Sequence, residues 1–294
     1  TLQAKHRFQE AMDLADRVLA TEKRSEMAWA IRFDCQLELG DYKDAAESLS
    51  NLLQLTDTAP VRARQARLAE ICGDWRLALV LIESCISEFP ETAWYHWRRG
   101  ELLYQRGKLS QARKSFKRGL RAEPKDGGCL VGLAKCEFAL GNVSQAESVL
   151  EQAVMLHGAP PIMSLLGDVI AARGDVALAG SWYDKTAAVM RAEAEVAGDA
   201  HAREVAMFLA DHGRESKRAV SLAELDLRQR KDIYAYDTLA WTCWADGQLS
   251  RAKELMDLAL QEQTQDPLLY FHAAMIYQAN KCDRADGFWM KLAK

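Results

Sequence analysis

Residues 93–124 read AWYHWRRGELLYQRGKLSQARKSFKRGLRAEP. The stretch predicts two short amphipathic helices joined by a turn at Gly107, because glycine reaches left-handed backbone angles at little cost and ends helices well. Ala112 begins the inner face of the second helix, and Phe116 follows four residues later on the same face. Pro124 stands where the second helix must stop. The stretch is therefore one helix–turn–helix unit of an all-α protein.

The same unit recurs along the chain. A turn followed by a small residue on the inner helix face returns at Ala11, Ala45, Ala78, Ala112, Ala146, Ala179, Ala219, Ala252 and Ala285. Neighbouring alanines in this series are 34, 33, 34, 34, 33, 40, 33 and 33 residues apart. A nearly fixed period in the low thirties indicates a repeat array, in which stacked units share one continuous core.

The pattern resembles the tetratricopeptide repeat, a unit of about 34 residues with small and aromatic residues at fixed places. In the unit at 93–126 the signature positions hold His96, Arg99, Gly100, Leu103, Ala112, Phe116 and Pro124. The Gly, Ala, Phe and Pro of the family are present there, whereas its Trp, Leu and Tyr are replaced. The unit at 233–265 has Tyr236, Leu239, Ala240, Cys243, Ala252 and Met256. The resemblance implies an all-α, right-handed superhelical solenoid of antiparallel helix pairs.

We expect one solenoid over residues 1–294. Its parts are a half repeat at 1–25, repeats at about 26–58, 59–92, 93–126, 127–159 and 160–192, an irregular segment at 193–232, and repeats at about 233–265 and 266–294. The first helix of the opening repeat would precede Thr1, so we expect a fragment or an N-terminus capped in another way. The last helix, at 284–294, ends the chain with Phe288, Trp289, Met290 and Leu292, whereas solenoid ends need a polar cap. We expect that the native chain continues there or that another chain, including a second copy, covers this end.

The one irregular spacing of 40 residues places its excess in residues 190–202, MRAEAEVAGDAHA. This segment is rich in Ala and Glu, which favour helix. We expect the flanking helices to be longer by one or two turns, with a break near Gly198. A lengthened helix pair is the main interpretation, and a hinge or a partner-docking segment is the alternative.

The resemblance also implies that the first helix of each repeat lines a concave groove that holds a partner segment. The groove positions are Trp94, Trp97, Glu101, Tyr104, Phe138, Tyr234, Asp237, Trp241, Trp244, Tyr270 and Tyr277. Because Trp and Tyr dominate binding hot spots, we expect a scaffold that binds a protein or peptide partner. Several of these rings could instead serve only packing between repeats. A carbohydrate-handling scaffold of a polysaccharide export or glycosyl-transfer system, and a regulatory region of a longer enzyme, are the alternative functions.

A basic stripe follows the second helix of the unit at 93–126. It consists of Arg113, Lys114, Lys117, Arg118 and Arg121, and the resemblance places it on the outer side. A solvated helix face is the simplest interpretation. The alternative is a dock for an acidic protein, a nucleic acid or a membrane surface. The net charge of −4 argues neither for nor against nucleic acid as a general partner, and nucleic acid is not the partner we favour.

The sequence offers no residue pattern for catalysis. Its seven cysteines are odd in number and form no CxxC, and its six histidines have no zinc-site spacing. No phosphate-binding loop and no Ser or Cys nucleophile motif occurs. We therefore expect no enzyme, no cofactor and no metal. Most cysteines occupy apolar-periodic positions, where they act as small hydrophobes; this favours the cytoplasm and leaves a periplasmic or other compartment open.

Overall fold

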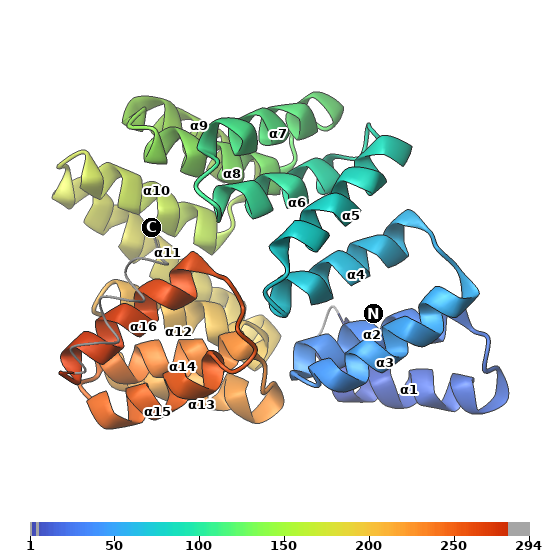
Figure 1. Ribbon diagram of the computed structural model, residues 1–294. Coiled ribbons are helices and arrows are strands. Elements are labelled where there is room, and N and C mark those ends of the chain that lie inside the picture. Colours follow the sequence, from blue (N-terminus) through green and yellow to red (C-terminus); the bar gives the residue numbers. More distant parts are fainter. Residues whose placement is uncertain (1, 4–5, 282–294) are drawn as a thin grey trace. The chain divides into compact units, whose positions relative to one another are not determined.

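A computed structural model of the chain describes residues 2–3 and 6–281. Over these residues the regular elements are sixteen α-helices and a short 3₁₀ helix, which confirms the expected all-α fold (Figure 1). The last expected helix, at 284–294, lies outside the described residues. The helices are α1 (Phe8–Thr21), α2 (Glu26–Leu39), α3 (Tyr42–Leu55), α4 (Ala59–Ile71), α5 (Trp75–Glu88), α6 (Ala93–Tyr104), α7 (Leu109–Ala122), α8 (Gly127–Ala139), α9 (Val143–His157), α10 (Pro160–Ala172), α11 (Val176–Ala197), η2 (Gly198–His201), α12 (Ala202–Asp211), α13 (Ser216–Gln229), α14 (Ile233–Ala245), α15 (Leu249–Ala259) and α16 (Pro267–Ala279).

The turns inside the repeats are built as the glycine pattern predicts. At the end of α2, Gly40 adopts a φ of 87°, a left-handed conformation that side chains other than glycine rarely adopt. The amide of Asp41 donates to the carbonyl of Gln36 at 2.8 Å, so the last carbonyls of the helix are satisfied. Gly107 closes α6 in the same way, with a φ of 65°.

The chain divides into two compact units, and unit 2 comprises residues 82–198. Phe116 of α7 is fully buried at its centre. Gly100 of α6 and Gly132 of α8 face this ring so closely that an added Cβ at either position would lie 2.3 Å from it. Glycine on both neighbouring helices therefore makes the space that the Phe116 side chain fills.

The 40-residue spacing between repeats corresponds to a longer helix at the end of unit 2. α11 has 22 residues, whereas α9 has 15, so the expected extension of a flanking helix is confirmed. The helix ends at Gly198, whose φ is 61°, and the 3₁₀ helix η2 follows directly. The expected break near Gly198 is therefore confirmed, while its role as a hinge or docking segment stays a prediction.

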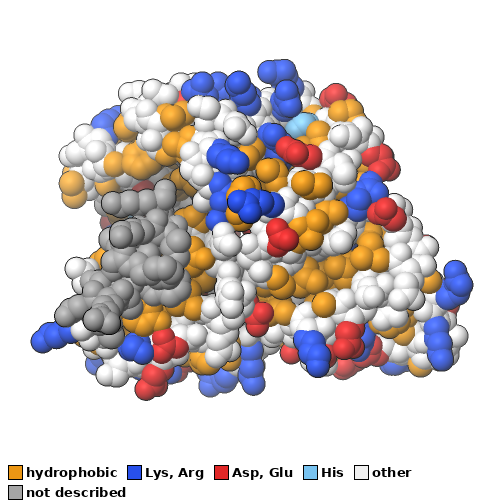
Figure 2. Space-filling model, viewed as in Figure 1, with side chains coloured by type: hydrophobic (Ala, Val, Ile, Leu, Met, Phe, Trp, Pro, Cys, Tyr) orange, Lys and Arg blue, Asp and Glu red, His pale blue; other side chains and the backbone are white. Residues whose placement is uncertain are grey.

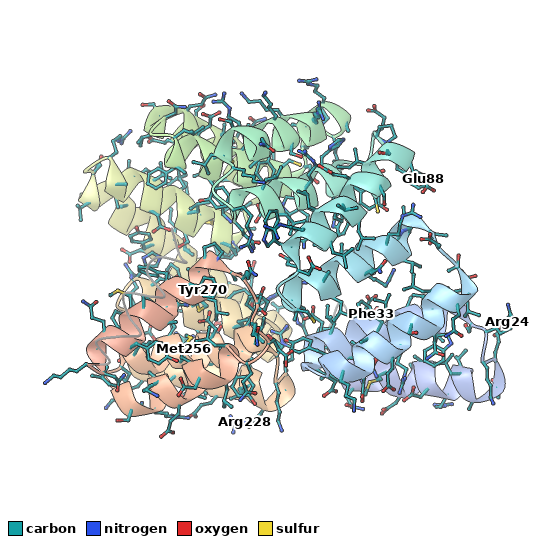
Figure 3. The ribbon with its side chains drawn as sticks, in the orientation of Figure 1. Arg24, Phe33, Glu88, Arg228, Met256 and Tyr270 are labelled. Carbon is teal, nitrogen blue, oxygen red and sulfur yellow. The ribbon has the colours of Figure 1, made fainter. Side chains whose placement is uncertain are left out.

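Unit 1 is made of two distant segments, residues 1–81 and 199–294. One of its cores contains Phe33 of α2 and Ile71 of α4 together with Ile233 of α14, so the two segments share buried apolar surface. Met256 lies in a second core, formed by helices of the later segment. Figure 3 labels Phe33 and Met256 at these places. Whether both units belong to one solenoid over residues 1–294 stays a prediction.

We call the contact between the two segments of unit 1 the seam. It joins the turns at Gly40 and Gly73 to the loops at Arg230–Ile233 and Gln263–Thr264. The amide of Lys231 donates to the carbonyl of Leu39 at 3.1 Å, and the amide of Ile233 donates to the Tyr42 hydroxyl at 3.0 Å. The Thr264 hydroxyl donates to the carbonyl of Ile71.

Buried charges beside the seam are paired. Arg203 of α12 donates to Asp226 and Asp232, whose side chains are almost fully buried. Arg230 also donates to Asp226, and its other nitrogen lies 3.4 Å from Glu38 of the early segment. A buried charge without a partner costs several kcal/mol, so this network depends on both segments staying together.

The six cysteines that the structure describes form no disulfide bond with one another, namely Cys35, Cys72, Cys85, Cys129, Cys136 and Cys243. All except Cys72 are buried. Burial raises the pKa of the Cys35 thiol to about 11, in spite of the hydrogen bond that it accepts from Gln3. The buried cysteines therefore fill core positions as neutral groups, as their apolar-periodic positions predict.

Candidate functional site

α6 carries the two tryptophans with which the predicted groove begins. Trp94 is 44% exposed, and Trp97 is half-buried. Their ring centroids lie 6.1 Å apart with the planes tilted by 59°, and the Tyr95 ring meets Trp94 edge-on at 5.4 Å. Because Trp94 and Trp97 are three residues apart on one helix, their rings form adjoining parts of one surface.

The Trp97 ring has two close neighbours. An added Cβ at Gly128, in the first turn of α8, would lie 2.8 Å from Cδ1 and Nε1 of the indole, so the ring packs directly on the glycine backbone. The Arg98 guanidinium lies over the ring, 5.4 Å from its centroid, at cation–π distance. The orientation of Trp97 is therefore fixed before any partner arrives.

The remaining predicted groove residues of unit 2 also belong to α6 and α8. Glu101 and Tyr104 are half-buried, and Phe138 is 37% exposed. Burial, together with the negative charges of Cys136 and Glu101 in their ionised forms, raises the pKa of the Tyr104 hydroxyl, so it stays a neutral donor. We call Trp94, Trp97, Tyr104 and Phe138 the aromatic surface of unit 2.

In unit 1 most of the predicted groove residues serve packing. Asp237, Trp241, Tyr270 and Tyr277 are buried, whereas Tyr234 and Trp244 are half-buried. The Tyr277 hydroxyl donates to Asp257. Trp241 is stacked between Trp244, at 4.3 Å between centroids, and His272, at 4.2 Å. These rings stabilise the interior of unit 1 and leave little of their area for a partner.

The stack encloses an ion pair. His272 Nδ1 lies 2.9 Å from Asp237 Oδ1, and both side chains are almost fully buried. Burial lowers the pKa of His272, but the adjacent Asp237 carboxylate outweighs it, so the net shift is upward. The indole Nε1 of Trp241 donates to Asp211 at 2.8 Å. The His272–Asp237 pair and the Trp241 indole nitrogen therefore each have a polar partner inside unit 1.

Comparison with known families agrees with the helix-pair geometry of this site. Two family models described as tetratricopeptide repeat match residues 64–127 and 103–168. Residues 64–168 are tetratricopeptide repeats. The match includes α6, α7 and α8, so the aromatic surface of unit 2 lies on helices of the repeat. A comparison with curated proteins gives no match.

Solved structures share the fold of this chain at low identity. Yeast Tom70 is 15% identical, with a TM-score of 0.55 over 96% of this chain and 60% of its own. A chain of the APC/C hetero-tetramer Cut9–Hcn1 is 15% identical, with a TM-score of 0.52 over 97% of this chain and 55% of its own. This chain therefore spans a little over half the length of either structure, and the likeness concerns the fold alone.

The basic face of the repeat helix α7 carries five cations. Arg113 and Lys117 approach the buried carboxylate of Glu137, at 3.5 and 3.8 Å. The other three, Lys114, Arg118 and Arg121, are exposed and make no ion pair within the described part of the chain. Figure 2 shows Lys and Arg side chains gathered along the upper edge of the view, over α7. Two of the predicted cations thus stabilise unit 2, and three remain for a partner.

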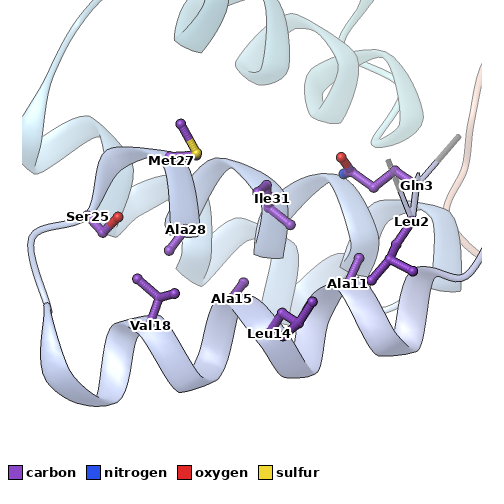
Figure 4. Close-up of a pocket in the computed structure, with 10 residues that line it drawn as sticks. All are labelled: Leu2, Gln3, Ala11, Leu14, Ala15, Val18, Ser25, Met27, Ala28 and Ile31. Atoms are coloured by element: carbon purple, nitrogen blue, oxygen red, sulfur yellow. The ribbon is translucent and has the colours of Figure 1, made fainter.

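A second apolar surface lies between α1 and α2 of unit 1. It is a groove of about 300 Å³, and Figure 4 shows Leu14 and Val18 on one side with Met27 and Ile31 on the other. Val18 is 42% exposed and Met27 74%. In the other described second helices the position equivalent to Val18 is buried, at Leu52, Cys85, Gly119, Ala153, Thr186, Asp226 and Ala259. The expectation that the N-terminal end is capped in another way stays a prediction.

Three features of the site have no signal in the repeat pattern. Phe271, which is 39% exposed beside the Trp241 stack, is one residue away from the predicted position Tyr270. His272 and Gly128 also fall outside the groove positions. The aromatic run at 270–272 could have drawn attention to Phe271, whereas the fit of Gly128 under Trp97 is visible only in three dimensions.

The described residues show no sign of a metal or a membrane span. Among them, no three His, Cys, Asp or Glu side chains come together in a way that would hold a metal ion. No described helix combines the length and the apolar character that crossing a membrane requires.

Proposed function

We propose that the protein is a non-enzymatic scaffold that binds a segment of a partner protein on the aromatic surface of unit 2. The observation that supports this most is the exposed Trp94 beside a Trp97 ring that contacts both Gly128 and Arg98. Rigid aromatic side chains bind with a small loss of conformational entropy, because their rotamers are already restricted. The free, mostly buried cysteines favour the cytoplasm as the place of this interaction.

The polar groups of the surface suit a polypeptide. Glu101 accepts hydrogen bonds, and Tyr104 remains a neutral donor next to it. An extended or helical segment could place apolar side chains on Trp94 and Phe138 while its amides or cationic side chains meet Glu101. The partner that fits this surface has aliphatic or aromatic side chains with a donor nearby.

We assign the basic face of α7 a steering role in this binding. The exposed cations Lys114, Arg118 and Arg121 attract an acidic flank of the partner through long-range electrostatics. Such charges raise the association rate more than they slow dissociation, and salt screens them. In the triple variant with all three changed to Gln, the association rate should fall and lose its salt dependence while the dissociation rate stays unchanged. An unaltered salt dependence would reject the steering role.

The test compares two matched tryptophan variants in unit 2. Trp97→Ala removes the aromatic surface, whereas Trp182→Ala removes a half-buried tryptophan of α11 that packs on the core of the unit. The partner is first captured from the source lysate and identified, and it is then titrated with the purified wild type and each variant. Trp97→Ala should weaken binding by about 2 kcal/mol or more, whereas Trp182→Ala should leave the affinity unchanged. Circular dichroism of both variants controls for unfolding.

Two outcomes would contradict the proposal. Equal affinity of the wild type and Trp97→Ala for the identified partner would place binding elsewhere. Displacement of the partner by an oligosaccharide, with direct glycan binding to the wild type, would favour the carbohydrate-handling alternative.

A further inference from the structure

A small pocket in the later segment of unit 1 is lined mainly by cations and leucines. Its volume is about 360 Å³, near the lower end of the range for ligand sites, and its lining residues are Glu224, Leu227, Arg228, Lys231, Leu239 and Arg251. They come from α13, α14, α15 and the loop after α13. None of the predicted groove residues lines this pocket, so it is separate from the aromatic positions of both units.

The two leucines join the pocket to the core of unit 1. Leu227 and Leu239 both pack in the core that contains Met256, and Leu239 is buried. Leu227 and Arg228 lie three and four residues after Glu224, so all three share one face of α13. Arg228, which Figure 3 labels, is exposed. The packing of α13 on the core therefore leaves this guanidinium at the pocket and open to solvent.

The loop that carries Lys231 is fixed on both sides. Arg230 donates to Asp226 at 2.7 Å, and Asp232 caps the start of α14. The amide of Lys231 donates to the carbonyl of Leu39 at 3.1 Å, across the seam. The Lys231 side chain is exposed. Since its main chain is already in place, binding of a ligand at this side chain requires little ordering of the backbone.

The charges that line the pocket do not cancel. Glu224 is the carboxylate of the pocket, and Arg251 Nη2 lies 2.6 Å from its Oε1, so these two charges compensate each other. Arg228 and Lys231 make no ion pair with any residue that the structure describes. The pocket therefore has an excess of two positive charges.

Helix stability accounts for one of the three cations. Arg228 lies in the last turn of α13, where a positive charge is favourable to the helix dipole. Lys231 lies beyond the end of that helix, and Arg251 lies in the first turn of α15, where a positive charge opposes the dipole. The gathering of cations from three elements around one pocket is better explained by an anionic ligand.

The size of the charge excess favours a phosphate monoester. A phosphate monoester carries about −1.5 to −2 charges at pH 7 and three strong acceptor oxygens, whereas a carboxylate carries a single charge. The Arg228 guanidinium can bind two phosphate oxygens side by side, and the Lys231 ammonium can donate to the third. Such a ligand would neutralise the excess that the pocket residues leave.

We propose that this pocket binds a phosphate monoester, carried by a small molecule or by a phosphorylated side chain of a partner protein, and that Arg228 and Lys231 contact the phosphate. The shared chemistry of the two sources is the dianionic phosphate group. The site belongs to unit 1 and does not depend on the aromatic surface of unit 2. Its ligands and variants differ from those that test the proposed scaffold function, so failure of one proposal leaves the other untouched.

The experiment titrates the full-length chain with three compounds by isothermal calorimetry. They are the peptide acetyl-Ala-phosphoserine-Ala-amide, its unphosphorylated form, and glycerol 2-phosphate. Arg228→Gln removes a pocket cation. Its matched control is Arg24→Gln, since Arg24 is an exposed arginine of unit 1 in the loop between α1 and α2 and makes no ion pair within the described residues. Both variants lose one guanidinium, and only one loses it from the pocket.

The wild type should bind at least one phosphate compound and not the unphosphorylated peptide. Arg228→Gln should weaken phosphate binding about tenfold, because it removes a charge-assisted hydrogen bond, whereas Arg24→Gln should change it less than about twofold. Tighter binding of the phosphopeptide would identify a phosphorylated protein as the source, and equal or tighter binding of glycerol 2-phosphate would identify a small molecule. Absence of binding by both phosphate compounds, or equal losses in the two variants, would overturn the proposal.

A second variant tests the charge excess by a gain in affinity. Glu224→Gln removes the pocket carboxylate and releases Arg251 for the ligand. It should bind the phosphate compound about fivefold more tightly than the wild type, the effect of one charge a few ångströms away in water. A variant that only disturbed packing would not gain affinity, and circular dichroism controls for folding. Unchanged or weaker binding by Glu224→Gln would reject the pocket as a phosphate site.

Discussion

The seam makes a sharp prediction about glycine. Gly40 and Gly247 end equivalent helices with φ angles of 87° and 80°. An alanine at either position pays the strain of the left-handed region, about 1–2 kcal/mol. At Gly247 nothing lies within 4 Å of the new Cβ, so Gly247→Ala should cost this strain alone.

At Gly40 the new methyl group meets the opposite segment. Its Cβ would lie 2.4 Å from the Lys231 carbonyl oxygen, about 1 Å short of an ordinary contact, so one backbone must move by that much. Overpacking of this kind costs about 1–3 kcal/mol. The shift also breaks the bond from the Lys231 amide to Leu39, worth about 1 kcal/mol. Gly40→Ala should therefore lose about 2–4 kcal/mol more than Gly247→Ala.

Urea unfolding followed by circular dichroism measures the two free energies, and hydrogen exchange locates the damage. The amide of Ile233, which donates to Tyr42, should exchange faster in Gly40→Ala and not in Gly247→Ala. If the two variants lose the same stability within about 0.5 kcal/mol, the range of ordinary surface substitutions, the seam does not hold the two segments together.

Three further predictions follow from the cores and the titrating groups. Phe116→Ala should lose about 3–5 kcal/mol in urea unfolding, because the facing glycines leave a cavity that no side chain can fill; a loss below about 1 kcal/mol would contradict this packing. His272 has a raised pKa in the folded state, so its pairing with Asp237 stabilises the protein below the unfolded pKa and is lost as pH rises through the folded pKa. As pH rises from about 6.5, the ordinary pKa of histidine, the wild type should therefore lose stability more steeply than His272→Gln, and parallel profiles would argue against the pair. Iodoacetamide should modify Cys72 before any other described cysteine in the native protein, because the others are buried and mostly protonated. Peptide mass mapping checks the order of modification, and early modification of Cys35 would show that its core opens.

The repeat architecture could be predicted because it depends on the spacing of residues that are close together in the sequence. Ala112 and its equivalents mark the inner faces, and glycines such as Gly107 end the helices, so period and helix pairing follow from residues only a few positions apart. The break near Gly198 could be predicted for the same reason. The excess length and the single glycine lie in one short segment.

The seam could not be predicted from the sequence. Its partners, such as Leu39 and Lys231, are almost two hundred residues apart, and no periodic signal connects them. The prediction of the groove positions of unit 1 rests on repeat register, which says which side of a helix a residue occupies. Register does not say whether another helix covers that side, and α4 does so at Tyr234. Trp241 is likewise buried because His272 and Trp244 stack on it.

The central claim is that the aromatic surface of unit 2 contacts a partner protein. The most direct measurement places a photo-crosslinking amino acid at Trp94 and, as a control, at Met155 of α9, which is 85% exposed in the same unit. Irradiation in source lysate should link one partner polypeptide at position 94 and not at position 155. The link should disappear when Trp97→Ala is added. No link at position 94, or the same products at both positions, would contradict the account.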